Sequence, residues 1–147
     1  MKDKRQLIPI AGLVITIALA TYMVVQASGQ GAIEVPGDFT NAAIAEVKDP
    51  QGNLVLQGRF NVSDEEDDDI ERKAILQPAA GDGASGDAEV EYARSQPTVQ
   101  EVEFAVRGLQ AGATFRFLID GHEVATATTD QSGNAELDFD VRMASAR

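Results

Sequence analysis

Residues 101–141 read EVEFAVRGLQAGATFRFLIDGHEVATATTDQSGNAELDFDV, and this stretch decides the fold class. Its apolar residues recur at every second position rather than at helical spacing. Val102 and Phe104 alternate with Glu101 and Glu103, and the same alternation returns around Phe117 and toward the end of the stretch. A period of two is typical of a strand that buries one face and exposes the other. The stretch therefore predicts consecutive half-buried strands with charged outer faces.

Turn residues fall between these strands. Asp120-Gly121 is the preferred two-residue loop of a type I′ hairpin, in which both residues adopt positive φ. Residues 130–133, Asp-Gln-Ser-Gly, predict the close of a further hairpin, and residues 49–53 predict an earlier turn.

Extending the pattern through the chain predicts an all-β fold, an antiparallel β-sandwich of seven or eight strands. The expected strands are 41–48, 54–62, 70–76, 87–93, 99–107, 113–119, 122–129 and 134–142. The expected core residues are Phe60, Val102, Phe104, Val106, Phe115, Phe117, Leu137 and Phe139.

A resemblance covers about half of the chain. Residues 73–141 contain KAIL, GDGASGDAEVEY and the long stretch quoted above, with an ASG-type strand, a GLxxGxxF hairpin and a final TTDxxG strand. This part resembles uncharacterised bacterial exported β-sandwich modules of immunoglobulin-like architecture. The resemblance implies export and a sandwich, and it implies no catalytic residue.

The N-terminus carries a membrane-targeting segment. Basic residues among positions 1–6 precede an uncharged run at 7–25, whose 19 residues would form a helix of about 28 Å, close to the ~30 Å of a bilayer core. One reading is an uncleaved single-pass anchor, with the C-terminal domain outside the cytoplasm. The other is a signal peptide cleaved at Ala18-Leu19-Ala20, which would give a secreted protein.

Both readings share one domain organisation. Residues 1–26 form the anchor or signal helix, 27–38 a Gly- and Ser-containing flexible tether, 39–142 the β domain and 143–147 a short tail.

The composition excludes several classes of function. The chain has no cysteine and one histidine, which removes disulfides, thiolate nucleophiles and multi-histidine metal centres. A formal net charge of −12 argues against nucleic acid as a partner. His122 beside Glu123 is the one histidine–carboxylate pair, and its place after a turn predicts an exposed residue rather than a general base.

An acidic run between two predicted strands is the candidate cation site. Residues 63–69 read SDEEDDD, and Asp64, Glu65, Asp67 and Asp69 could supply oxygen ligands to calcium. The competing reading is a solvated loop of mutually repelling charges, since the spacing is not that of an EF-hand. Asp82 and Asp87 would complete a site if their loop lay at the same end.

The sequence therefore predicts a protein that is not an enzyme and requires no cofactor, with calcium as the one candidate ion. Its expected role is binding or structural, at the cell envelope, with the membrane as a partner through the N-terminal helix. A second hypothesis is a pilin-like subunit that self-associates through that helix. An exported enzyme is the third hypothesis, for which no catalytic constellation can be identified.

Overall fold

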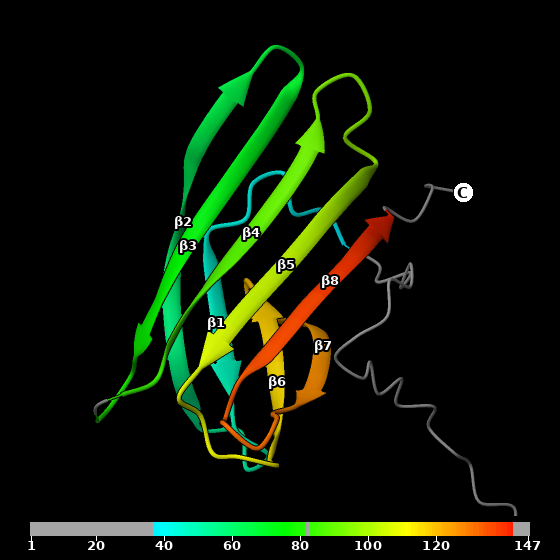
Figure 1. The fold of residues 1–147 in the computed structure, drawn as a ribbon. Coiled ribbons are helices and arrows are strands. Elements are labelled where there is room, and N and C mark those ends of the chain that lie inside the picture. Colours follow the sequence, from blue (N-terminus) through cyan, green and yellow to red (C-terminus); the bar gives the residue numbers. More distant parts are fainter. Residues whose placement is uncertain (1–36, 82, 143–147) are drawn as a thin grey trace, which may run out of the picture.

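The computed structural model describes residues 37–81 and 83–142, and of residues 63–66 it describes the backbone (Figure 1). These residues form eight antiparallel strands and no helix, which confirms the predicted all-β class. The strands are β1 (Ile44–Lys48), β2 (Leu54–Glu66), β3 (Asp69–Pro78), β4 (Ser85–Ala93), β5 (Val99–Arg107), β6 (Thr114–Ile119), β7 (His122–Thr128) and β8 (Ala135–Arg142).

The strands belong to one nearly closed sheet, in the order β7-β6-β1-β2-β3-β4-β5-β8. The sheet folds over itself, so that β3, β4, β5 and β8 form one layer and β2, β1, β6 and β7 lie behind it (Figure 1). A single sheet supplies both layers because β2 and β3 stay paired along most of their length. Side-chain alternation reveals which face of a strand is buried, but it does not reveal which strands pair.

The core lies between the two layers. Phe104 on β5 meets Phe117 on β6 edge to face, with ring centroids 5.2 Å apart and an interplanar angle of 67°. This is a favoured geometry for an aromatic pair, and it joins the centres of the two layers. All eight predicted core residues are buried: Phe60, Val102, Phe104, Val106, Phe115, Phe117, Leu137 and Phe139.

Gly58 permits the close pairing of β2 and β3. A Cβ atom on this glycine would lie 2.4 Å from the carbonyl oxygen of Ile75, so a larger residue would push the strands apart. Farther along, the register shifts between Val62 and Asp64. Irregularities of this kind bend a strand and increase its twist.

The Asp120-Gly121 turn has the predicted conformation. Both residues adopt positive φ, 50° and 80°, and they connect β6 to β7 as a type I′ hairpin requires. The Asp120 carboxylate also accepts hydrogen bonds from the backbone N–H groups of Ala43, at 3.1 Å, and Ile44, at 2.8 Å. One side chain thus ties the hairpin to the start of β1.

The turn at 130–133 is correctly predicted as a turn, but the prediction that it closes a hairpin is wrong. β7 and β8 form the two opposite edges of the sheet, and the turn carries the chain from one layer to the other. The Asp130 carboxylate accepts hydrogen bonds from the N–H groups of Ser132, at 2.8 Å, and Asn134, at 2.9 Å. These local bonds form the turn whether or not the strands that follow it pair.

The segment before β1 closes one end of the core. Phe39 is buried, and its N–H donates to Oε1 of Gln100 at 2.8 Å. Gln100 is fully buried, and its Nε2 donates to Pro97 O at 2.9 Å and to Asp38 Oδ1 at 3.2 Å. Tyr92 Oη donates to Thr40 O at 3.1 Å. Every polar group of the buried Gln100 amide therefore has a partner in or beside this segment.

The predicted N-terminal helix at 1–26, residues 27–36 of the predicted tether and the 143–147 tail lie outside the described residues. Among the residues that are described, no helix has the length and hydrophobicity needed to cross a bilayer.

Candidate functional site

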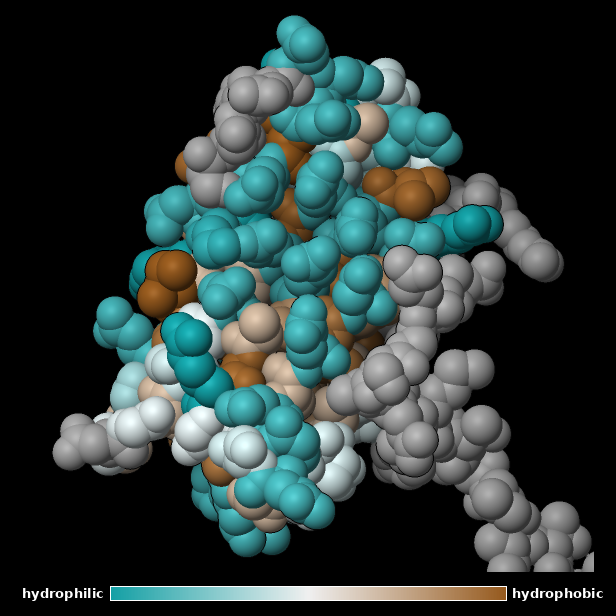
Figure 2. Space-filling view, in the orientation of Figure 1, coloured by the Kyte–Doolittle hydropathy of each residue, from teal (hydrophilic) through white to brown (hydrophobic). Residues whose placement is uncertain are grey.

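The outer face of β3, β4, β5 and β8 is covered with carboxylates, and we call it the acidic face. Polar side chains dominate this side of the molecule (Figure 2). The strand register places acidic residues next to one another across the sheet. The acidic face comprises Glu71, Asp87, Glu89, Glu91, Glu101, Glu103, Glu136, Asp138 and Asp140.

The same alternation that builds the core builds this face. On β5 and β8 the inward positions are buried and most of the outward positions are exposed. Because successive residues of a strand point to opposite faces, the apolar set fills the core and the acidic set lies outside. Burial of the core thereby holds the carboxylates in fixed rows.

Three of these carboxylates converge. Glu103 lies directly opposite Asp138 in the β5–β8 pairing, and Glu101 is two residues from Glu103 on the same face of β5. One carboxylate oxygen from each of Glu101, Glu103 and Asp138 lies within 4.8 Å of the others, and all three residues are exposed. Like charges directly opposite each other in a sheet are destabilising.

Partial burial and the closeness of these carboxylates raise the pKa values of Glu101 and Glu103. The pKa of Glu103 is raised by partial burial and by the nearby charges of Asp138, Glu89, Glu101 and Glu136. The pKa of Glu101 is raised by partial burial and by Asp138, Glu91 and Asp140. Both effects disfavour the ionised form.

Basic residues on the described part of the acidic face stand at its margins. Lys73 on β3 makes an ion pair with Glu89 and lies 3.7 Å from Asp87, and these carboxylates raise the pKa of Lys73. Arg107 and Arg142 are the last residues of β5 and β8, and Arg107 Nε donates to Ser85 Oγ at 3.1 Å. The centre of the face, at Glu101, Glu103 and Asp138, has no basic residue directly opposite it in the register.

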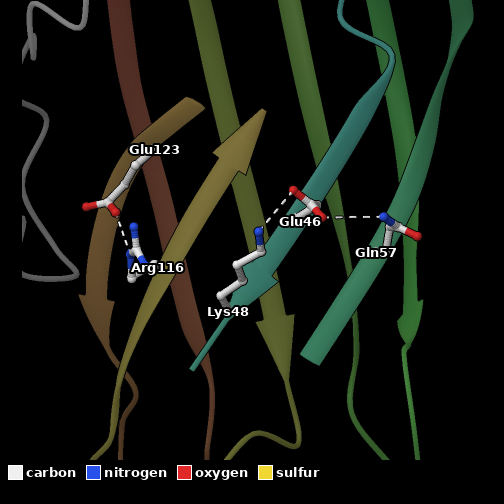
Figure 3. Close-up of polar contacts among 5 residues, drawn as sticks. All are labelled: Glu46, Lys48, Gln57, Arg116 and Glu123. Atoms are coloured by element: carbon white, nitrogen blue, oxygen red, sulfur yellow. Dashed lines mark hydrogen bonds and ion pairs between the residues drawn. The ribbon is translucent and has the colours of Figure 1, made fainter. Parts of the chain in front are cut away.

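The opposite outer face, formed by β1, β2, β6 and β7, balances its charges, and we call it the balanced face. Arg116 Nε lies 2.5 Å from Glu123 Oε2, and Lys48 Nζ lies 3.6 Å from Glu46 Oε2 (Figure 3). Gln57 Nε2 is 3.5 Å from Glu46 Oε1. Each glutamate shown on this face therefore has a basic neighbour.

The predicted calcium residues lie at the tip of the β2–β3 hairpin. The expectation of a loop is wrong here, because β2 continues to Glu66 and β3 begins at Asp69, leaving a two-residue turn. Backbone pairing of Asp64 with Glu71 and of Glu65 with Ile70 extends the ladder through the acidic run. Pairing along two long strands thus overrides the local repulsion that predicts a loop.

One of the remaining acidic residues of the tip, Asp68, is hydrogen-bonded to the connection between β4 and β5. Asp67 adopts a positive φ of 48° in the turn, and Asp67, Asp68 and Asp69 are exposed. Asp68 accepts hydrogen bonds from the N–H of Ser95, at 3.0 Å, and from the Ser95 hydroxyl. The side chains of Asp64 and Glu65 lie outside the described part, so calcium binding by Asp64, Glu65, Asp67 and Asp69 stays a prediction.

Of the other candidate residues, Asp87 and His122 lie away from this tip. Asp82 lies outside the described residues, and Asp87 belongs to the acidic face beside Lys73. His122 is exposed as the first residue of β7, and its neighbour Glu123 pairs with Arg116 instead. The prediction that His122 is exposed is confirmed, although His122 belongs to β7 rather than to the turn.

Sequence reasoning missed the convergence of Glu101, Glu103 and Asp138. The alternation does mark all three as outward residues, but their proximity depends on the pairing of β5 with β8, whose sequences are separated by two other strands. The three carboxylates could approach one cation together, but acidic surfaces that bind no ion show the same proximity, so we assign no metal to them.

Comparisons with known proteins add no relative. The chain matches no family model, and neither a curated protein nor a solved structure is significantly similar to it.

Proposed function

We propose that this chain is a membrane-tethered, extracytoplasmic binding domain of the cell envelope, without enzymatic activity, and that its acidic face binds a cationic partner. One observation carries the binding role: the acidic face concentrates carboxylates around Glu101, Glu103 and Asp138, whereas Glu46 and Glu123 on the balanced face each have a basic neighbour. The apolar segment at 7–25 supports the membrane tether.

A one-sided charge distribution favours a partner of opposite charge. Surfaces of complementary potential accelerate association and select among partners, and the effect weakens as salt is added. A basic peptide or the basic surface of another envelope protein would relieve the repulsion among the carboxylates. The binding free energy would therefore include this relief of repulsion in addition to the attraction between the partner's basic groups and the carboxylates.

The test compares two variants that each lose four negative charges. One carries Glu91→Gln, Glu101→Gln, Glu103→Gln and Asp138→Asn on the acidic face. The control carries Asp64→Asn, Glu65→Gln, Asp67→Asn and Asp69→Asn at the hairpin tip. The probe is a capped lysine-rich peptide, and its affinity for the full-length protein in neutral detergent is measured by calorimetry at several salt concentrations.

We expect the acidic-face variant to bind at least about tenfold more weakly and the tip variant to stay within about threefold of the original chain, since nearby charges dominate at a Debye length of ~8 Å. An equal loss in both variants would show that the peptide responds to net charge alone. That result would sink the assignment of the partner to the acidic face.

A further inference from the structure

We propose that the free edge of β8 receives an extended peptide as a ninth strand, and that the peptide alternates basic and apolar side chains. The inference deepens the proposed function and rests on it, because it names the mode by which the acidic face would hold a cationic partner. It adds a requirement that charge alone does not impose, namely a partner with free backbone hydrogen-bonding groups.

The first observation is the strand edge. β8 pairs with β5 over its whole length, from Val106↔Ala135 to Val99↔Arg142. On its other side, no described strand pairs with it, since β8 and β7 end the sheet. An unpaired edge strand presents a row of N–H and C=O groups that an extended peptide can use.

The second observation is the side-chain order along that edge. Glu136, Asp138 and Asp140 occupy the outward positions of β8, whereas Leu137 and Phe139 point into the core. A ninth strand would place its own alternate side chains about 4.5–5.5 Å from these residues. Basic side chains would then stand beside carboxylates, and apolar side chains would extend the core.

The other edge does not offer the same match. On β7, the outward residues Thr126 and Thr128 are uncharged, and Glu123 is already paired with Arg116. Both edge strands have backbone N–H and C=O groups that a peptide could use, but only β8 adds a row of carboxylates that would attract a basic strand. The geometry therefore favours β8 as the docking edge.

The probe is an eight-residue capped peptide of alternating lysine and valine, which matches the eight residues of β8. In an extended peptide the lysine amides lie along one edge and the valine amides along the other. Two further peptides carry N-methyl groups on all lysine amides or on all valine amides, which removes the donors of one edge and leaves the charge unchanged.

Binding to the full-length protein in neutral detergent is measured by calorimetry, and amide hydrogen exchange is followed with and without peptide. We expect one methylated peptide to lose about tenfold or more in affinity, since several hydrogen bonds disappear together, and the other to stay within about threefold. The unmethylated peptide should slow exchange at alternate residues of β8 and leave β7 unchanged.

Equal affinities for all three peptides would overturn the ninth strand while leaving a charge-driven partner of the acidic face intact. Absence of binding by all three would refute the proposed function as well. Protection, before peptide is added, of the β8 amides that point away from β5 would also overturn the inference, because the free edge would then be occupied by the chain itself.

Discussion

The acidic face and the balanced face belong to the same sheet, but their charges are arranged differently: the balanced face places opposite charges side by side, and the acidic face places like charges side by side. On the balanced face Glu46 and Glu123 have Lys48 and Arg116 as neighbours, whereas on the acidic face Glu103 lies opposite Asp138. Exposed ion pairs contribute little to stability, and like charges that face each other across strands cost a comparable amount. A protein shaped by stability alone would gain from mixing the charges of the acidic face, so its one-sided charge supports a binding role.

The largest effect is expected where the two layers meet. Phe117→Ala should lower the free energy of unfolding by about 3–5 kcal/mol, because the ring is fully buried against Phe104 and its loss leaves a cavity. Urea denaturation measures this cost. Ile75→Ala is the matched control, since Ile75 is 60% exposed on the outer side, and it should change stability by less than about 0.5 kcal/mol. Similar costs for both substitutions would refute the assignment of the core.

A smaller effect is expected at the segment that closes the core. Gln100→Ala should cost about 1–3 kcal/mol, because it leaves the Phe39 N–H and the Pro97 carbonyl without their buried partner. Thermal unfolding is the measurement. Gln57→Ala on the balanced face is the control, since its long contact with Glu46 is exposed, and its melting temperature should be unchanged.

The pH dependence separates the acidic face from the carboxylates of the connecting segments by sign. The raised pKa values of Glu101 and Glu103 favour the protonated carboxyl in the folded state. Their contribution to stability is complete below an unfolded pKa of about 4.3 and is lost as pH rises through the folded pKa. The melting temperature should therefore rise as pH falls from 7 toward about 4.3 at low salt.

Below about pH 3.9 the trend should reverse. Hydrogen bonds from Thr40 lower the pKa of Asp38, and backbone hydrogen bonds from Asn134 and Ser132 lower the pKa of Asp130. Stability from these carboxylates is present above about pH 3.9 and is lost as pH falls through their lowered values. A double variant with Glu101→Gln and Glu103→Gln should flatten the rise between pH 7 and 5 and keep the loss at lower pH. A wild-type melting temperature that falls between pH 7 and 5 would contradict the crowding of the acidic face.

The smallest effect is expected when a glutamate is changed to glutamine on each face. Glu103→Gln should stabilise the domain by a few tenths of a kcal/mol at pH 7, because it relieves repulsion with Asp138. Glu123→Gln should destabilise it by a similar amount, because Arg116 loses its ionised partner. Urea titrations at low and high salt should show opposite signs that both shrink as salt increases.

Local features of the chain were predictable because local chemistry determines them. Alternation marks the strands and the core from Phe60 to Phe139, since burial selects apolar residues at every second position. The Asp120-Gly121 hairpin follows from the two positive φ values that this dipeptide tolerates. The excess of carboxylates on the outer side of β5 and β8 is likewise visible in the alternation.

The sequence by itself determined the class of fold, the buried positions and the outward direction of the acids. Only the tertiary structure decided that β7 and β8 end the sheet, that the acidic run continues β2 and β3, and that Glu101 and Glu103 meet Asp138. The physical reason is that strand pairing uses backbone groups common to all residues, so partners far apart in the chain leave little trace in side-chain pattern. Which charges lie close together across strands therefore also depends on strand pairing, which the side-chain pattern does not reveal.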